Sequence, residues 1–375
     1  MISLYSSKLV TQMVASFSSS FSEKASKVDK IFILHKKNLH SLVQTILKHY
    51  RVIGPMKING NVFFRELKEA DELFLEYKGH TRLPPKKYFL PEKEVLFSYE
   101  IKGNEVIIKD HLEYLKDYKA VLIGIHPCDI QALNILDKVF ISEFEDPYYT
   151  TRRKNTLIIG LTCNEPSEYC FCYFTRSGPN INDGYDLLLT DLGDMYLVEV
   201  GSSQGKSFID QFSIFFDKAD PQLLKKKEEK INSLVKQMQK LGLPFFNEIY
   251  STMVNAFYDD FWEDLGRMCL ACGKCNYSCP TCYCFDVQEE SEPDLTEGRR
   301  IRRWDSCHFL SFTRVASGEI FRKDRTSRVK QRIYHKLVYS VNNIGTISCV
   351  GCGRCIETCT ANIDIRDVVK NLMKR

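Results

Sequence analysis

The stretch CLACGKCNYSCP at residues 269–280 spaces four cysteines three, three and four residues apart. A second run, CVGCGRCIETC at residues 349–359, repeats this spacing, with Thr360 where the first run has a proline. Zinc sites usually combine two cysteine pairs across a long spacer, whereas short steps of this kind wrap the backbone around one corner of an iron–sulfur cubane. The two runs therefore predict two 4Fe–4S clusters.

The fourth cysteine of each run raises the question of which cluster it serves. In two-cluster ferredoxin runs the longer last step commonly sends that cysteine to the other cluster. The first cluster is then expected on Cys269, Cys272, Cys275 and Cys359, and the second on Cys349, Cys352, Cys355 and Cys279. The long spacer between the runs leaves the alternative open, in which each run keeps its own fourth cysteine. Small residues inside the runs let backbone amides approach the sulfurs and tune the cluster potential.

Seven further cysteines lie outside these runs. In the C-terminal half they are Cys282, Cys284 and Cys307, which are either buried thiols beside a cluster or ligands of a third cluster or metal. In the N-terminal half they are Cys128, Cys163, Cys170 and Cys172. With no export signal in the chain, this many cysteines point to a reducing cytoplasm and to metal ligation rather than disulfides.

The N-terminal cysteines follow predicted strands. Residues 120–125 (AVLIGI) and 157–161 (LIIGL) are expected to form buried strands, and they precede Cys128 and Cys163. A helix is expected over 130–140 with Asp129 as its N-cap. Because the strand ends of an α/β sheet converge on one edge, the four thiols are expected either to meet there at a cluster or metal, or to pack separately.

Periodicity divides the chain into three parts. Residues 1–29 are a Ser-rich extension, residues 30–243 show alternating strand and helix patterns, and residues 244–375 carry the cysteine runs. An amphipathic helix that opens at Asp220-Pro221 and closes at Gly242 sets the boundary. The expected fold class is an α/β N-terminal domain plus a mainly helical, two-cluster ferredoxin-like C-terminal domain.

Composition and missing motifs exclude several functions. The 375 residues carry a net charge of +4, too mild to imply a nucleic-acid partner, and no apolar run is long enough for a transmembrane segment. Glycine-rich nucleotide loops and hydrolase motifs are missing, so no catalytic residue is expected. Between the runs, basic residues outnumber acidic ones. They predict either a solvated helix face, a basic belt around anionic clusters, or a docking face, over Arg299, Arg300, Arg302, Arg303, Arg314, Arg322, Lys323, Arg325, Arg328, Lys330, Arg332 and Lys336.

Several segments together resemble one protein family. They are GIHPCDI at 124–130, DPYY at 146–149, TC at 162–163, CFC at 170–172, GYDL at 184–187, CPTCYC at 279–284, RRWDSC at 302–307 and the second cysteine run. Over roughly residues 30–370 the chain is similar to the beta subunit of sulfhydrogenases (cytosolic NAD(P)-linked nickel–iron hydrogenases) and to the iron–sulfur electron-transfer subunit of anaerobic sulfite reductases.

The resemblance implies an iron–sulfur electron-transfer subunit of a multi-subunit cytoplasmic oxidoreductase. Its partners would be a flavin- and NAD(P)-binding reductase subunit and a catalytic subunit of nickel–iron or sirohaem type, reached in the hydrogenase through a small iron–sulfur subunit. The hydrogenase assignment is favoured, with the sulfite reductase assignment second. Two less favoured interpretations are a disulfide or polysulfide reductase in its own right and a zinc-bound scaffold. Operon neighbours or metal analysis would separate these interpretations.

Overall fold

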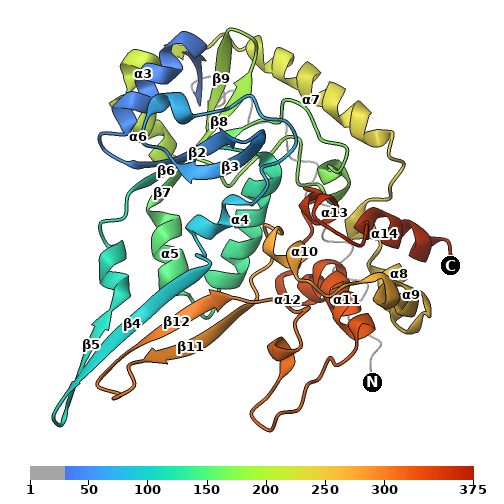
Figure 1. Ribbon diagram of the computed structural model, residues 1–375. Coiled ribbons are helices and arrows are strands. Elements are labelled where there is room, and N and C mark those ends of the chain that lie inside the picture. Colours follow the sequence, from blue (N-terminus) through green and yellow to red (C-terminus); the bar gives the residue numbers. More distant parts are fainter. Residues whose placement is uncertain (1–29) are drawn as a thin grey trace.

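The computed structural model describes residues 30–375, and the predicted extension over 1–29 lies outside the described residues (Figure 1). The N-terminal part is built on an eight-stranded sheet in the order β10-β1-β9-β8-β7-β6-β2-β3. Its strands are β1 (Ile31–His35), β2 (Arg51–Ile58), β3 (Asn61–Glu66), β6 (Ala120–Ile125), β7 (Thr156–Leu161), β8 (Leu187–Asp191), β9 (Met195–Val200) and β10 (Asp217–Lys218).

The centre of this sheet is parallel and buried. β2, β6, β7 and β8 run parallel to one another, and every residue of β6 is buried. Strands covered on both faces need such continuous apolar runs, which explains why AVLIGI and LIIGL were recognisable in the sequence. The mixed α/β character predicted for this part is confirmed.

Helices cover the two faces of the sheet. On one face α3 (Lys36–Ile46) and α6 (Ser203–Gln211) share a core with the strands, through residues such as Ile46 and Phe208. On the other face α4 (Pro127–Phe140) and α5 (Pro147–Lys154) supply Leu133 and Tyr149 to a second core. α7 (Leu223–Gln239) then leads toward the C-terminal part (Figure 1).

A second, four-stranded sheet was not predicted as such. It has the order β11-β12-β4-β5 and comprises β4 (Lys93–Lys102), β5 (Glu105–Asp110), β11 (Phe285–Ser291) and β12 (Glu297–Trp304). It projects from the body of the molecule as a long arm (Figure 1). Because β12 pairs with β4, strands from before and after residue 243 share one sheet. The C-terminal part thus contains two long strands besides its helices, and the domain boundary near Leu243 stays a prediction.

The C-terminal helices form a compact group around Trp262 and Tyr334. They are α8 (Tyr250–Asn255), α9 (Phe261–Met268), α10 (Lys274–Tyr277), α11 (Arg325–Tyr334), α12 (Ser340–Ile344), α13 (Arg354–Glu357) and α14 (Ile365–Met373). The apolar core of this group also contains Cys128, Cys170 and Cys172 from the N-terminal part. The two parts therefore share a core at the place where the cysteines concentrate. Within residues 30–375, none of the helices combines the length and apolar character that crossing a bilayer requires.

Candidate iron–sulfur sites

The first cysteine run lines a pocket together with the last cysteine of the second run. Cys269, Cys272, Cys275 and Cys359 all border it, beside the apolar side chains of Val329, Ile333, Ile363 and Ile365. α10 begins directly after Gly273, whose φ of +76° turns the chain between two of the cysteines. The amide of Ala271 lies 3.4 Å from Cys269 Sγ, and the amide of Ile363 lies 3.3 Å from Cys359 Sγ. Amides directed at sulfur are the contacts that stabilise a cluster.

The second run lines a second pocket in the same manner. Cys349, Cys352 and Cys355 border it together with Cys279, the last cysteine of the first run. Gly353, with φ at +81°, precedes α13 as Gly273 precedes α10. The two runs therefore adopt equivalent turns, and the fourth cysteine of each run borders the pocket of the other run. The crossed assignment of the cluster ligands stays a prediction.

The chemistry of each pocket fits a 4Fe–4S cluster. The second pocket is bordered by four cysteines and the first by five, because Cys355 borders both, and neither has a carboxylate among its bordering residues. In the described part of the chain, no three His, Cys, Asp or Glu side chains gather closely enough to hold a single metal ion. Thiolates around a cubane stand further apart than thiolates around one ion, because each binds a different iron. The pockets are thus suited to a cluster, whose iron would supply one-electron chemistry there.

Two buried cations lie beside the pockets. Arg332 borders both, and its Nη2 donates to the carbonyl of Cys275 at 3.3 Å. Although burial works against its charge, Cys275 and Cys355 raise the pKa of Arg332. Lys336 donates to Thr281 Oγ1 at 2.8 Å, and Cys279 and Cys282 likewise raise its pKa against the effect of burial. Both side chains are placed to offset the negative charge of thiolate-bound clusters.

The other basic residues between the runs do not form one belt. Arg302 is buried against Glu94 and Asp146, while Arg299 and Arg303 both pair with Glu290 across the β11–β12 hairpin. The charges of these arginines are thus neutralised by carboxylates, namely Glu94 and Asp146 in the N-terminal part and Glu290 on the strand that pairs with β12. Beside Arg332 and Lys336, Arg325 also lies at a cysteine run, since its Nη1 donates to the carbonyl of Cys269 at 3.1 Å.

The cysteines Cys282, Cys284 and Cys307 are arranged in pairs. Cys282 interacts with Cys279, and Cys284 interacts with Cys307, whose hydrogen bond lowers the pKa of Cys284 to about 6. The amide nitrogen of Asn276 also donates to Cys307 Sγ at 3.0 Å. A further metal site on these three residues stays a prediction.

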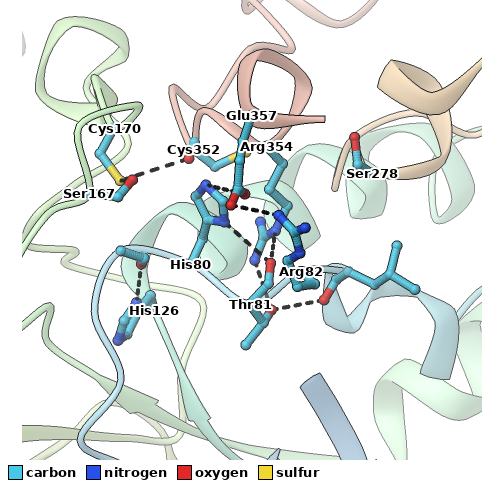
Figure 2. Close-up of polar contacts among 12 residues, drawn as sticks. His80, Thr81, Arg82, His126, Ser167, Cys170, Ser278, Cys352, Arg354 and Glu357 are labelled. Carbon is cyan, nitrogen blue, oxygen red and sulfur yellow. Dashed lines mark hydrogen bonds and ion pairs between the residues drawn. The ribbon is translucent and has the colours of Figure 1, made fainter. Parts of the chain in front are cut away.

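A buried polar network fixes the second run to the N-terminal sheet. Figure 2 shows Arg354, from between Cys352 and Cys355, directed at Thr81. Its guanidinium also binds both carboxylate oxygens of Asp129, at 2.6 and 2.7 Å. The prediction that Asp129 caps α4 was wrong: His126 occupies the N-cap position and Pro127 starts the helix. Asp129 lies inside the first turn, where its carboxylate is free to pair with Arg354.

His80 is a titratable member of the same network. Its Nε2 lies 3.7 Å from Glu357, yet burial and then the charge of Arg354 lower the pKa of His80 to about 3. The folded state therefore favours the neutral ring, whereas the unfolded chain takes up a proton near pH 6.5. Stability from this residue is fully present above pH 6.5 and is lost progressively as the pH falls toward 3.

We expect His80→Gln to flatten the loss of stability in mild acid. A pKa lowered by several units corresponds to a loss of roughly 2 kcal/mol between neutral pH and pH 5. The measurement is the chemical denaturation midpoint of the chain and its variant at intervals from pH 7.5 to 5, where the exposed His49→Gln serves as control. If the denaturation midpoints of His80→Gln and the parent chain fell in parallel with pH, His80 would not be the group that titrates.

Comparison with known proteins agrees with this geometry. Residues 268–363, which contain all eight cysteines of the two runs, match the family model described as a 4Fe-4S dicluster domain. The fold and site thus define an iron–sulfur protein of the dicluster class. Along 335 residues the chain is 36% identical to the sulfhydrogenase 2 subunit beta of Pyrococcus furiosus, covering 88% of this chain and 95% of that protein. The chain belongs to the sulfhydrogenase beta subunit family, as its sequence motifs had suggested.

Proposed function

We propose that this chain is the electron-transfer subunit of a multi-subunit cytoplasmic hydrogenase. It relays electrons between a flavin- and NAD(P)-binding subunit and a nickel–iron catalytic subunit, the latter through a small iron–sulfur subunit. The observation that supports the proposal is the pair of adjacent cysteine-lined pockets, each bordered by the fourth cysteine of the other run. The identity to a sulfhydrogenase beta subunit favours this assignment over the sulfite reductase alternative.

The adjacency of the pockets is what an electron relay requires. Arg332 and Cys355 border both of them, so clusters held there are separated by single side chains. In this proposal Cys269, Cys272, Cys275 and Cys359 hold one cluster, and Cys279, Cys349, Cys352 and Cys355 hold the other. The protein supplies the thiolates, the amides that stabilise bound sulfur, and the buried cations that make reduction easier.

The direct test is anaerobic purification with iron, sulfide and EPR analysis. We expect at least about eight iron and eight sulfide atoms per chain, and reduced signals of two interacting cubanes. The native protein should also co-purify with a flavoprotein and a nickel-containing subunit. Zinc in place of iron would contradict the electron-transfer function. Co-purification with a sirohaem protein would instead assign the chain to a sulfite reductase. Oxidation of NAD(P)H by the isolated chain would show that the coenzyme binds to this chain and not to a partner subunit.

A further inference from the structure

The four N-terminal cysteines meet at one edge of the eight-stranded sheet. β6 and β7 are parallel neighbours, with Ile125 in register with Gly160. Cys128 lies in the first turn of α4 directly after β6, and Cys163 follows the end of β7. Since parallel neighbours end at the same edge, topology brings these two thiols to one place.

The segment with Cys170 and Cys172 folds back over this edge. The amide of Phe171 donates to the carbonyl of Gly351 at 2.8 Å, which anchors the segment between the sheet and the second cysteine run. A Cβ built on Gly178 would lie 2.8 Å from Cys172 Sγ and 3.6 Å from Pro127. The Cys172 sulfur therefore lies beside the first turn of α4, which carries Cys128.

The four thiols are buried, since their residues are only 6–7% exposed. Three of them, Cys163, Cys170 and Cys172, lie within ten residues of one another in the segment that follows β7. Four buried thiols so close together gain from iron, because thiolate–metal bonds offset the cost of burying their charge.

We propose that Cys128, Cys163, Cys170 and Cys172 ligate a third 4Fe–4S cluster. A single zinc ion is disfavoured, because the described residues contain no group of three side chains at single-ion spacing. The cysteines of the two runs, which lie in the matched 4Fe-4S dicluster domain, form no such group either. The N-terminal group thus has the four-thiol donor set of a cubane site, and none of its residues belongs to the matched dicluster domain.

The four N-terminal cysteines lie next to the second cysteine run, so a third cluster could exchange electrons with the cluster of that run. Cys170 Sγ lies 3.8 Å from the carbonyl of Cys352, and Figure 2 shows the two residues facing each other. Phe171, between Cys170 and Cys172, borders the second pocket. A reduced cluster on the second run would pass one electron to an oxidised third cluster, with no bond broken and no proton moved. The cluster count is independent of the proposed function, whereas this electron exchange rests on it.

The test uses Cys128→Ala and Cys163→Ala in the full-length, anaerobically purified and reconstituted chain. These two cysteines come from different elements and, unlike Cys170 and Cys172, do not flank Phe171. We expect the parent chain to hold about twelve iron atoms and each variant to lose about a third of them. The integrated EPR signal should fall from about three reduced clusters to about two, and spin coupling to the second cluster should disappear.

A matched control separates ligation from folding. Ser177→Ala removes a buried hydroxyl of the same segment, and it should leave the iron content unchanged. Retained signals of the other two clusters show that each cysteine variant is folded. A parent chain with about eight iron atoms that the variants do not alter overturns the third cluster but leaves the two-cluster function intact. A parent chain with fewer than about eight iron atoms, or with zinc, contradicts the proposed function itself.

Discussion

Arg354→Met is expected to destabilise the chain more than any other single replacement of a charged side chain outside the cluster ligands. The Arg354 residue is 1% exposed, and its guanidinium is shared between Asp129 and Thr81. Removing one member of a buried ion pair leaves an unpaired charge, which typically costs about 3–5 kcal/mol. Because Arg354 lies between two cysteines of the second run, the same change should loosen the second cluster.

A double-mutant cycle separates the ion pair from simple packing. Asp129→Leu alone should cost about as much as Arg354→Met, since it leaves the guanidinium unpaired. The double variant should recover part of the loss, because well-packed apolar residues can replace a buried pair at little net cost. The measurements are the denaturation midpoint and the rate of iron release to a chelator. The exposed Arg267→Met, which breaks a surface pair with Asp264, should stay within about 1 kcal/mol of the parent chain. A similarly small effect for Arg354→Met would contradict a stabilising role for this network.

This network shows where sequence reasoning reached its limit. Asp129 and Thr81 are remote from Arg354 in the chain, and no local pattern links an arginine within a cysteine run to a carboxylate in the first turn of a helix. The sequence favours Asp129 as an N-cap because Asp is common at that position, but Pro127 occupies the first position of the helix. Only the tertiary fold reveals that the partner of Asp129 is a cation.

The projecting sheet illustrates the same limit. Residues 297–304 (EGRRIRRW) carry four arginines and have no clear alternation of buried and exposed residues. The sequence therefore predicted a solvated helix face, a basic belt or a docking face instead of a strand. Pairing with β4, about two hundred residues earlier, decides its structure. By contrast, the buried strands β6 and β7 were predictable because their apolar runs are local. The cysteine pockets were predictable for a similar reason: their spacing fixes the turns.

Replacing the fourth cysteine of either run is the second change for which we expect a large effect, the loss of a whole cluster. Cys279 borders the pocket of the second run and Cys359 borders the pocket of the first. Alanine is the suitable replacement, because a serine oxygen can take the place of a thiolate on iron. In Cys359→Ala we expect the complete loss of one cluster, about four iron atoms, while the other cluster stays EPR-active.

The identity of the lost cluster decides the arrangement. Cys272→Ala and Cys349→Ala provide reference spectra, each lacking the cluster of one run. If the ligands cross, the EPR spectrum of Cys359→Ala should match that of Cys272→Ala. The spectrum of Cys279→Ala should then match that of Cys349→Ala. Each loss should also lower the stability of this part of the chain, since cluster binding contributes to folding. The reverse matching of the spectra would mean that each run keeps its own fourth cysteine, and unchanged iron in all four variants would refute the ligand assignment.

The crossed result would mean that neither cluster can form until both runs, separated by the β11–β12 hairpin and α11, have met, so that cluster assembly and the folding of this part are one event.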